Sequence, residues 1–257
     1  MKTIFIITGI ILLLILSSSC EEESARAPFV FVGLYARIEN STVSSANLKS
    51  NSNHTLTAPY DSLHVDSIKI LANHLQFHID NKYDELYTLD TFIFKFGYSS
   101  PFIINFNNFT NLFDDPNNIG GLLLIGILDN VYFEHYRIST DEINLYKNDT
   151  KLSDFTTLDR YTTIIEGTIF KGNDTTHFIY RSTANANIKI NIQTDYPISD
   201  RINLEPYEHY YGFFTINAKG IFINNGILLD PLDENNRAFI DSKLNQYKFD
   251  INKSMDW

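Results

Sequence analysis

The chain has 257 residues, of which 31 are acidic and 20 are basic, and its formal net charge is -11 at pH 7. An acidic surface repels phosphate backbones, so this balance argues against nucleic acid as a partner. A single cysteine excludes an intramolecular disulfide, and a chain of this length buries roughly 70% of its unfolded surface, so we expect stability to come from a hydrophobic core.

The chain begins with the order of a secretory signal, in which a charged residue precedes an apolar run and then small residues. Lys2 supplies the charge, residues 4–16 are almost entirely apolar, and three serines precede Cys20. At roughly 13 residues the apolar run is shorter than the 18 or more that span a bilayer. We therefore expect residues 1–19 to be cleaved from the mature protein.

A secretory signal that ends at a cysteine resembles the signal of Bacteroidota lipoproteins. The resemblance implies that Cys20 carries acyl chains such as palmitate and that the protein is anchored in the outer membrane. Several acyl chains on one residue anchor a protein stably, because each buried methylene contributes about 0.8 kcal/mol. The alternative is an ordinary cleaved signal with an unpaired thiol nearby.

Three consecutive glutamates follow the cysteine within an acidic tether, residues 20–28. Glu21, Glu22 and Glu23 resemble the acidic stretch that follows the lipidated cysteine in Bacteroidota lipoproteins exported to the cell surface. The resemblance implies a surface-exposed protein, and the alternative is a tether that is acidic only because it stays solvated.

The rest of the chain is dominated by short runs of β-branched and aromatic residues separated by turn residues. Residues 40–60 are polar and predict a long connection or a poor strand. Asp233 is a plausible N-cap for a helix over residues 234–247. Strands are predicted at residues 29–38, 67–79, 87–96, 102–106, 122–128, 131–138, 142–146, 162–170, 176–181, 188–193, 210–216 and 220–223.

These elements predict a mainly β fold, an antiparallel β-sandwich or barrel-like domain with one short C-terminal helix. The domain covers residues 29–257, either as one unit or as two β-subdomains that divide near residue 159. Residues 161–247 also resemble uncharacterised β-sandwich lipoproteins of Bacteroidota, and that resemblance implies a fold without assigning a catalytic residue.

Familiar catalytic signatures are missing from the sequence. Gly167 and Gly172 have the glycine spacing of a phosphate-binding loop, but Asn173 and Asp174 occupy the positions of its lysine and hydroxyl residue. These residues predict a hairpin turn instead. The cysteine is assigned to lipid, so a thiol nucleophile is excluded, and carboxylates such as Glu205 and Glu208 are the only support for a hydrolase. We predict no enzymatic activity.

Metal sites have two candidates. His74 and His78 could share a metal on a helix, but on the predicted strand they lie about 13 Å apart, so we place them on its polar face. Asp230, Asp233 and Glu234 offer oxygen ligands suited to structural calcium, although turn and cap roles explain them equally well. A second acidic loop, residues 114–118, is a weaker candidate, and no other cofactor is expected.

Residues 206–214 form the densest aromatic stretch. Tyr207, His209 and Tyr211 beside Glu208 are candidates for stacking and hydrogen-bonding a sugar. On a strand alternate rings point inward, so at least half of this stretch should belong to the core.

Three functions are consistent with these features. The first is a non-catalytic lipoprotein of the outer membrane whose β-domain binds a ligand or protein partner at the cell surface. The second is a fimbrial or assembly subunit, in which an extended segment adds to a neighbour's sheet edge. The third is a glycan-binding module of a polysaccharide-uptake system.

Overall fold

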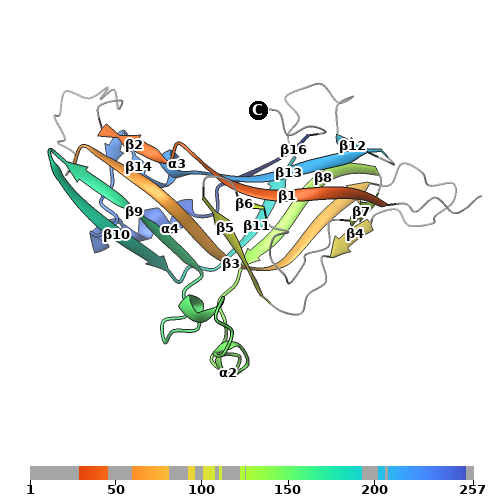
Figure 1. Cartoon of the computed structure of the whole chain (residues 1–257), viewed down its shortest axis with the longest axis horizontal. Helices are drawn as coiled ribbons and strands as arrows, with labels where there is room; N and C mark the ends of the chain where they lie inside the picture. The colour runs from red at the N-terminus through yellow and green to blue at the C-terminus, as the bar shows by residue number, and fades with distance from the viewer. Residues whose placement is uncertain are drawn as a thin grey trace, which may run out of the picture.

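The computed structural model describes residues 29–45, 60–80, 92–95, 101–107, 110–111, 122–124, 126–192, 202–205 and 208–252. Two β-sheets lie in two layers, and neither closes on itself (Figure 1). The fold is therefore mainly β and sandwich-like, which confirms the predicted fold class and excludes the barrel-like form of it. The predictions for the signal, Cys20 and the three glutamates lie outside the described residues.

The first sheet is built around β1, which pairs with β13 along nine residues in parallel. The predicted antiparallel order is wrong for this pair. The two strands are joined through most of the chain rather than by a hairpin, so nothing local fixes their relative direction. The strands of this sheet are β1 (Phe29–Glu39), β6 (Thr110–Asn111), β7 (Leu122–Leu124), β13 (His209–Asn217) and β16 (Tyr247–Asn252).

The second sheet is organised by β3, a strand of 19 residues, Ser62–Asp80. Along one edge of β3 lie β8 and β9 end to end, so strands from both sides of residue 159 share one sheet. β10 continues the sheet beyond β9. The other strands are β2 (Thr42–Ser44), β4 (Phe92–Lys95), β5 (Phe102–Phe106), β8 (Gly126–His135), β9 (Thr163–Lys171), β10 (Asp174–Ser182), β11 (Ala186–Asn191) and β12 (Ile202–Leu204).

Two bulges in β3 shift which side chains face the core. The register against β9 shifts between Val65 and Ser67, and the register against β8 shifts between Asn73 and Gln76. Leu71 and Leu75, which strict alternation would place on one face, therefore lie on opposite faces. An extra residue in a strand reverses the alternation beyond it, and that is why a strict period of two fails here.

The two layers meet through aromatic side chains. Phe133 of β8 packs edge-on against Phe214 of β13, with ring centroids 5.8 Å apart. Phe77 of β3 packs edge-on against Phe249 of β16 at the same distance. Such pairs contribute about 0.5–1.5 kcal/mol beyond the area they bury, so they favour this particular stacking of the sheets.

A 27-residue insert, residues 136–162, leaves the sheet between β8 and β9 and protrudes below it in Figure 1. It contains α2 (Ile143–Tyr146) and η3 (Ser153–Phe155). Residues 142–146 were predicted as a strand, which is wrong. Their apolar side chains, Ile143 and Tyr146, are three residues apart and pack together on the insert's small core. That core includes Phe155 and joins the outer face of the second sheet at Leu71.

The C-terminal part contains α3 (Ala218–Phe222), β14 (Ile223–Asn224), β15 (Ile227–Leu228), η5 (Glu234–Asn236) and α4 (Arg237–Lys243). Residues 220–223 were predicted as a strand but lie mostly in α3, because the Asn217 side chain accepts a hydrogen bond from the Gly220 N–H and caps a helical turn. Asp233 caps η5 as predicted. The predicted helix ends early, since Tyr247 begins β16 and is held in the sheet. No helix among the described residues could span a membrane.

Candidate functional site

A groove of about 620 Å³ opens at the end of β10, between the insert and the segment that leads into α4. Ile179 and Arg181 of β10 are exposed and alternate with buried Tyr180, so the groove lies on the outer face of the second sheet and crosses the edge of β10. We call it the arginine groove. Its charged and exposed aliphatic lining residues are Arg137, Asp159, Ile179, Arg181, Leu232, Glu234 and Arg237.

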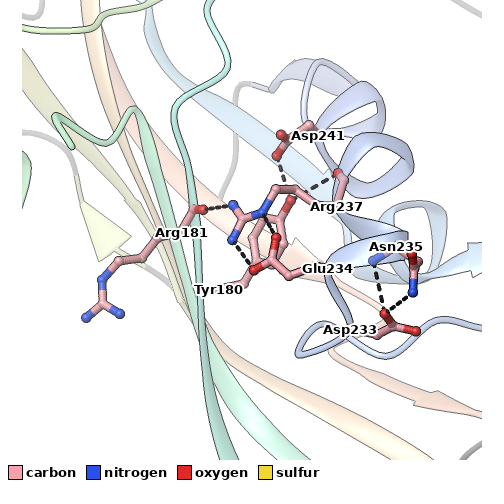
Figure 2. Close-up of polar contacts among 7 residues, drawn as sticks. All are labelled: Tyr180, Arg181, Asp233, Glu234, Asn235, Arg237 and Asp241. Carbon is pink, nitrogen blue, oxygen red and sulfur yellow. Dashed lines mark hydrogen bonds and ion pairs between the residues drawn. The ribbon is translucent and has the colours of Figure 1, made fainter.

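Arg237 is held by hydrogen bonds along the edge of its guanidinium and by the Tyr180 ring on one face (Figure 2). Its Nε and Nη2 donate to the two carboxylate oxygens of Glu234 at 2.7 and 3.0 Å, and its Nη1 donates to the backbone oxygen of Arg181 at 2.6 Å. The hydrogen bonds to Glu234 raise the pKa of Arg237, and the hydrogen bonds from Arg237 lower the pKa of Glu234. Both groups therefore stay charged, and the ion pair joins η5 and α4 to β10.

Tyr180 anchors the same corner from within. Its ring lies under the Arg237 guanidinium at 5.3 Å, and its hydroxyl donates to Asp241 Oδ1 at 2.6 Å. Burial, and then the bond to Asp241, raise the pKa of Tyr180, so the hydroxyl stays protonated. The floor of the arginine groove is therefore rigid at this end.

Arg137 and Tyr161 form the opposite wall, where the insert begins and ends. Arg137 donates from Nη2 to the Asp159 backbone oxygen at 2.9 Å and from Nε to the Arg160 backbone oxygen at 3.2 Å. The Tyr161 hydroxyl donates to Asp159 Oδ2 at 2.5 Å, and this bond raises the pKa of Tyr161. Backbone oxygens carry no net charge, so these bonds orient Arg137 without neutralising it.

Arg181, like Arg137, has no acidic partner among the described residues. Its guanidinium lies over the Tyr161 ring at 5.7 Å and makes no hydrogen bond or ion pair with a described residue. Figure 2 shows it extending away from Arg237. A guanidinium that is stacked on one ring keeps its edge of N–H donors available, and that edge binds an oxyanion through two parallel hydrogen bonds.

Taken together, the arginine groove holds three guanidiniums against two carboxylates, on a chain whose overall charge is negative. One carboxylate, Glu234, is already paired with Arg237. Exposed aliphatic side chains, Ile179 and Leu232, stand beside the charges. The arrangement is suited to a ligand that carries carboxylate or similar oxyanions next to apolar groups.

The predicted aromatic site lies elsewhere, on the first sheet. Tyr207 is outside the described residues, His209 is exposed, and Tyr211 is half-buried with its ring 6.2 Å from that of Tyr35. Tyr210, Phe213 and Phe214 are buried, so most of the described rings belong to the core, as predicted, although the burial of both Phe213 and Phe214 departs from strict alternation. The structure does not bring these residues to the arginine groove.

The predicted calcium ligands have local partners. Asp230 Oδ1 accepts from the Leu232 N–H at 2.8 Å, Asp233 Oδ1 accepts from the Asn235 N–H at 2.9 Å, and Glu234 pairs with Arg237. Across the part of the chain that the structure describes, no three acidic, histidine or cysteine side chains gather closely enough to hold a metal. Asp230 and Asp233 therefore have turn and cap roles, and the calcium site stays a prediction.

The histidines divide between surface and core. His74 and His78 lie on a strand as predicted, and His74 Nδ1 is 2.9 Å from Glu134 Oε1. His135 lies between the layers, where its Nε2 is 2.7 Å from the Tyr247 hydroxyl and its ring stacks beside Phe133. Burial lowers the pKa of His135 to about 4, so this histidine is neutral at physiological pH.

We expect His135 to make the fold sensitive to acid. The folded pKa lies below the ordinary value of 6.5, so the unfolded chain binds the proton first as pH falls. Stability is therefore complete above pH 6.5 and is lost between pH 6.5 and 4, by about 2 kcal/mol at pH 5. In urea denaturation, the free energy of unfolding of the native protein should fall with acid by about 2 kcal/mol more than that of His135→Gln at pH 5. His177→Gln, at an exposed histidine of β10, should keep the pH dependence of the native protein, and equal pH dependence in all three proteins would contradict this prediction.

Comparisons with protein-family models, with curated proteins and with solved structures found no match to this chain.

Sequence reasoning missed the arginine groove, because its residues come from three separate regions. A signal was nevertheless present, since Arg137, Arg160 and Arg181 each stand next to a tyrosine. On a strand such neighbours point to opposite faces, so the pair Tyr180 and Arg181 places a ring in the core and a cation outside.

Proposed function

We propose that this protein is a non-catalytic lipoprotein of the outer membrane whose β-sandwich domain binds a negatively charged ligand in the arginine groove. The observation that carries the binding function is the Arg181 guanidinium, which is oriented by Tyr161 and has no acidic partner among the described residues. The anchor and the cell-surface location rest on Cys20 and the glutamates that follow it.

Binding fits the groove better than catalysis does. A nucleophilic hydroxyl needs a lowered pKa or an adjacent base that removes its proton. The hydrogen bond from Tyr161 to Asp159 raises the pKa of the tyrosine instead. The contacts of Arg237 and Arg137 fix charges in place, and fixed charges give a binding site its specificity.

The glycan alternative has weaker support than the arginine groove. A sugar platform needs an open aromatic face, and Tyr211 is half-buried against Tyr35.

Arg181→Gln tests the proposed function. We expect the native protein to bind polyglutamate and the variant to bind it at least tenfold more weakly, because a charge-assisted bidentate bond is lost. Thermal stability should change little, since among the described residues the Arg181 guanidinium has no hydrogen bond or ion pair to lose and lies over the Tyr161 ring alone. Isothermal titration calorimetry at low salt measures the affinity, and added salt should weaken it.

Lys171→Gln is the matched control, because it removes an exposed cation at the far end of the same hairpin. It should bind polyglutamate as the native protein does. Equal binding by the native protein and Arg181→Gln would overturn the proposed site. Palmitate labelling of Cys20→Ser, and protease treatment of intact cells, test the anchor and the exposed location separately.

A further inference from the structure

β10 is the terminal strand of the second sheet, and no strand among the described residues pairs with its outer edge. Asp174, Thr176, Phe178, Tyr180 and Ser182 exchange hydrogen bonds with β9, since the two-residue turn at Gly172 makes Lys171 and Asp174 a bonded pair. The backbone groups of Thr175, His177 and Ile179 therefore point away from the sheet. No described residue hydrogen-bonds to them.

The arginine groove closes one end of this edge. The backbone oxygen of Arg181 also points outward, and Arg237 Nη1 donates to it at 2.6 Å. Arg237 thus occupies the last outward backbone oxygen of β10, so an added strand can pair with β10 only as far as Ile179. Beyond the edge, the groove has a second wall that includes Pro231 and Leu232. Ile179 and Arg181 belong both to this edge and to the lining of the groove, so the edge leads directly into the groove.

We propose that the ligand of the arginine groove is an extended acidic peptide segment, which adds to β10 as a further strand and places carboxylates beside Arg181 and Arg237. This inference rests on the proposed function. Hydrogen bonds between the peptide backbone and the outward backbone groups of Thr175, His177 and Ile179 supply affinity. The groove supplies the preference for acidic side chains. Because side chains alternate along a strand, the carboxylates of the peptide lie on the face of Arg181 and its apolar side chains lie on the opposite face.

Charge and shape favour a peptide over an acidic polysaccharide. An open edge presents alternating N–H donors and C=O acceptors in register with another backbone, and a sugar chain lacks that repeat. Sugars stack on open aromatic rings. Among the described residues, two tyrosine rings line the groove, and each is covered by a guanidinium: Arg181 lies over Tyr161 and Arg237 lies over Tyr180.

Hydrogen exchange on the native protein tests the inference directly. The probe is an end-blocked hexapeptide of alternating valine and glutamate, and the matched control peptide has lysine in place of glutamate. We expect the acidic peptide to slow exchange of the amides of Thr175, His177 and Ile179 at least tenfold. The amides of Thr176 and Phe178, already bonded to β9, should not change. The lysine peptide should bind at least tenfold more weakly.

Two variants separate the edge from the charge. His177→Pro removes an outward N–H without breaking a bond to β9, and proline is tolerated at such edge positions. It should weaken the acidic peptide at least tenfold, whereas His177→Ala should bind it within twofold of the native protein. Arg181→Gln should weaken the peptide as His177→Pro does.

The outcomes distinguish this inference from the function on which it rests. If Arg181→Gln weakens binding while His177→Pro and the edge amides are unaffected, the groove binds anions without strand addition and the inference is overturned. Tighter binding of polygalacturonate than of the peptide would also overturn it. If the amides of Thr175, His177 and Ile179 exchanged slowly without peptide, and more slowly as protein concentration rose, the inference would be overturned, because the added strand would then come from a second copy of this chain. If Arg181→Gln bound the peptide as tightly as the native protein does, the proposed function itself would be overturned.

Discussion

Gly167→Ala is expected to destabilise the domain by about 3 kcal/mol, because the added methyl has no room. A Cβ at this position would lie against the backbone oxygen of His64 and 2.6 Å from the Phe178 ring. Gly167 sits in the middle of β9, with β3 on one side and β10 on the other, so neither neighbour can move without breaking its own pairing. Urea denaturation followed by far-ultraviolet circular dichroism measures the loss.

Gly172→Ala is the matched control in the turn of the same hairpin. Gly172 has a φ of 59°, and nothing lies within 4 Å of a Cβ built there. The alanine should therefore cost about 1 kcal/mol, the strain of a left-handed backbone, without a clash. The strand packing at Gly167 and the positive φ at Gly172 each require a glycine, so the hairpin accounts for both residues of the phosphate-loop-like pattern. Equal losses of stability in the two variants would show that the close approach at Gly167 is not limiting.

Phe155→Ala is expected to cost about 3 kcal/mol and to abolish binding in the arginine groove. Phe155 is fully buried in the insert's core, where it joins Leu152 and Ile138 to Leu71 and Ile164 on the sheet. The ends of the insert supply Asp159 and Tyr161, and Tyr161 supports Arg181. Loosening the insert should therefore remove the support for Arg181. Calorimetric titration with polyglutamate and hydrogen exchange across residues 136–162 measure the two effects.

Leu158→Ala controls for any change in the insert. Leu158 lies three residues after the end of η3, and it is 95% exposed. Its removal should leave both stability and binding unchanged. If Phe155→Ala retained native binding, the insert would be a separate appendage and not a support for the arginine groove.

The arginine groove shows why sequence reasoning found residues but not the site. Arg137, Arg181 and Arg237 lie on separate segments, and they meet only because β8 and β9 continue along one edge of β3 while α4 folds back over β10. Conversely, Asp230, Asp233 and Glu234 are neighbours in sequence, yet each binds a different local partner. Closeness along the chain therefore suggested a site where the structure has a turn and a cap.

The sequence by itself determined the mainly β class, the hairpin at Gly172, the Asp233 cap and the burial of most of the aromatic rings near Tyr210. Each of these depends on contacts between residues close in the chain, so local propensity and periodicity are sufficient. Only the tertiary structure decided the parallel pairing of β1 with β13, the opposite faces of Leu71 and Leu75, and the arginine groove. These features depend on bulges and on pairings between strands that are distant in the sequence. Neither produces a periodic pattern of apolar residues that could be recognised in the sequence.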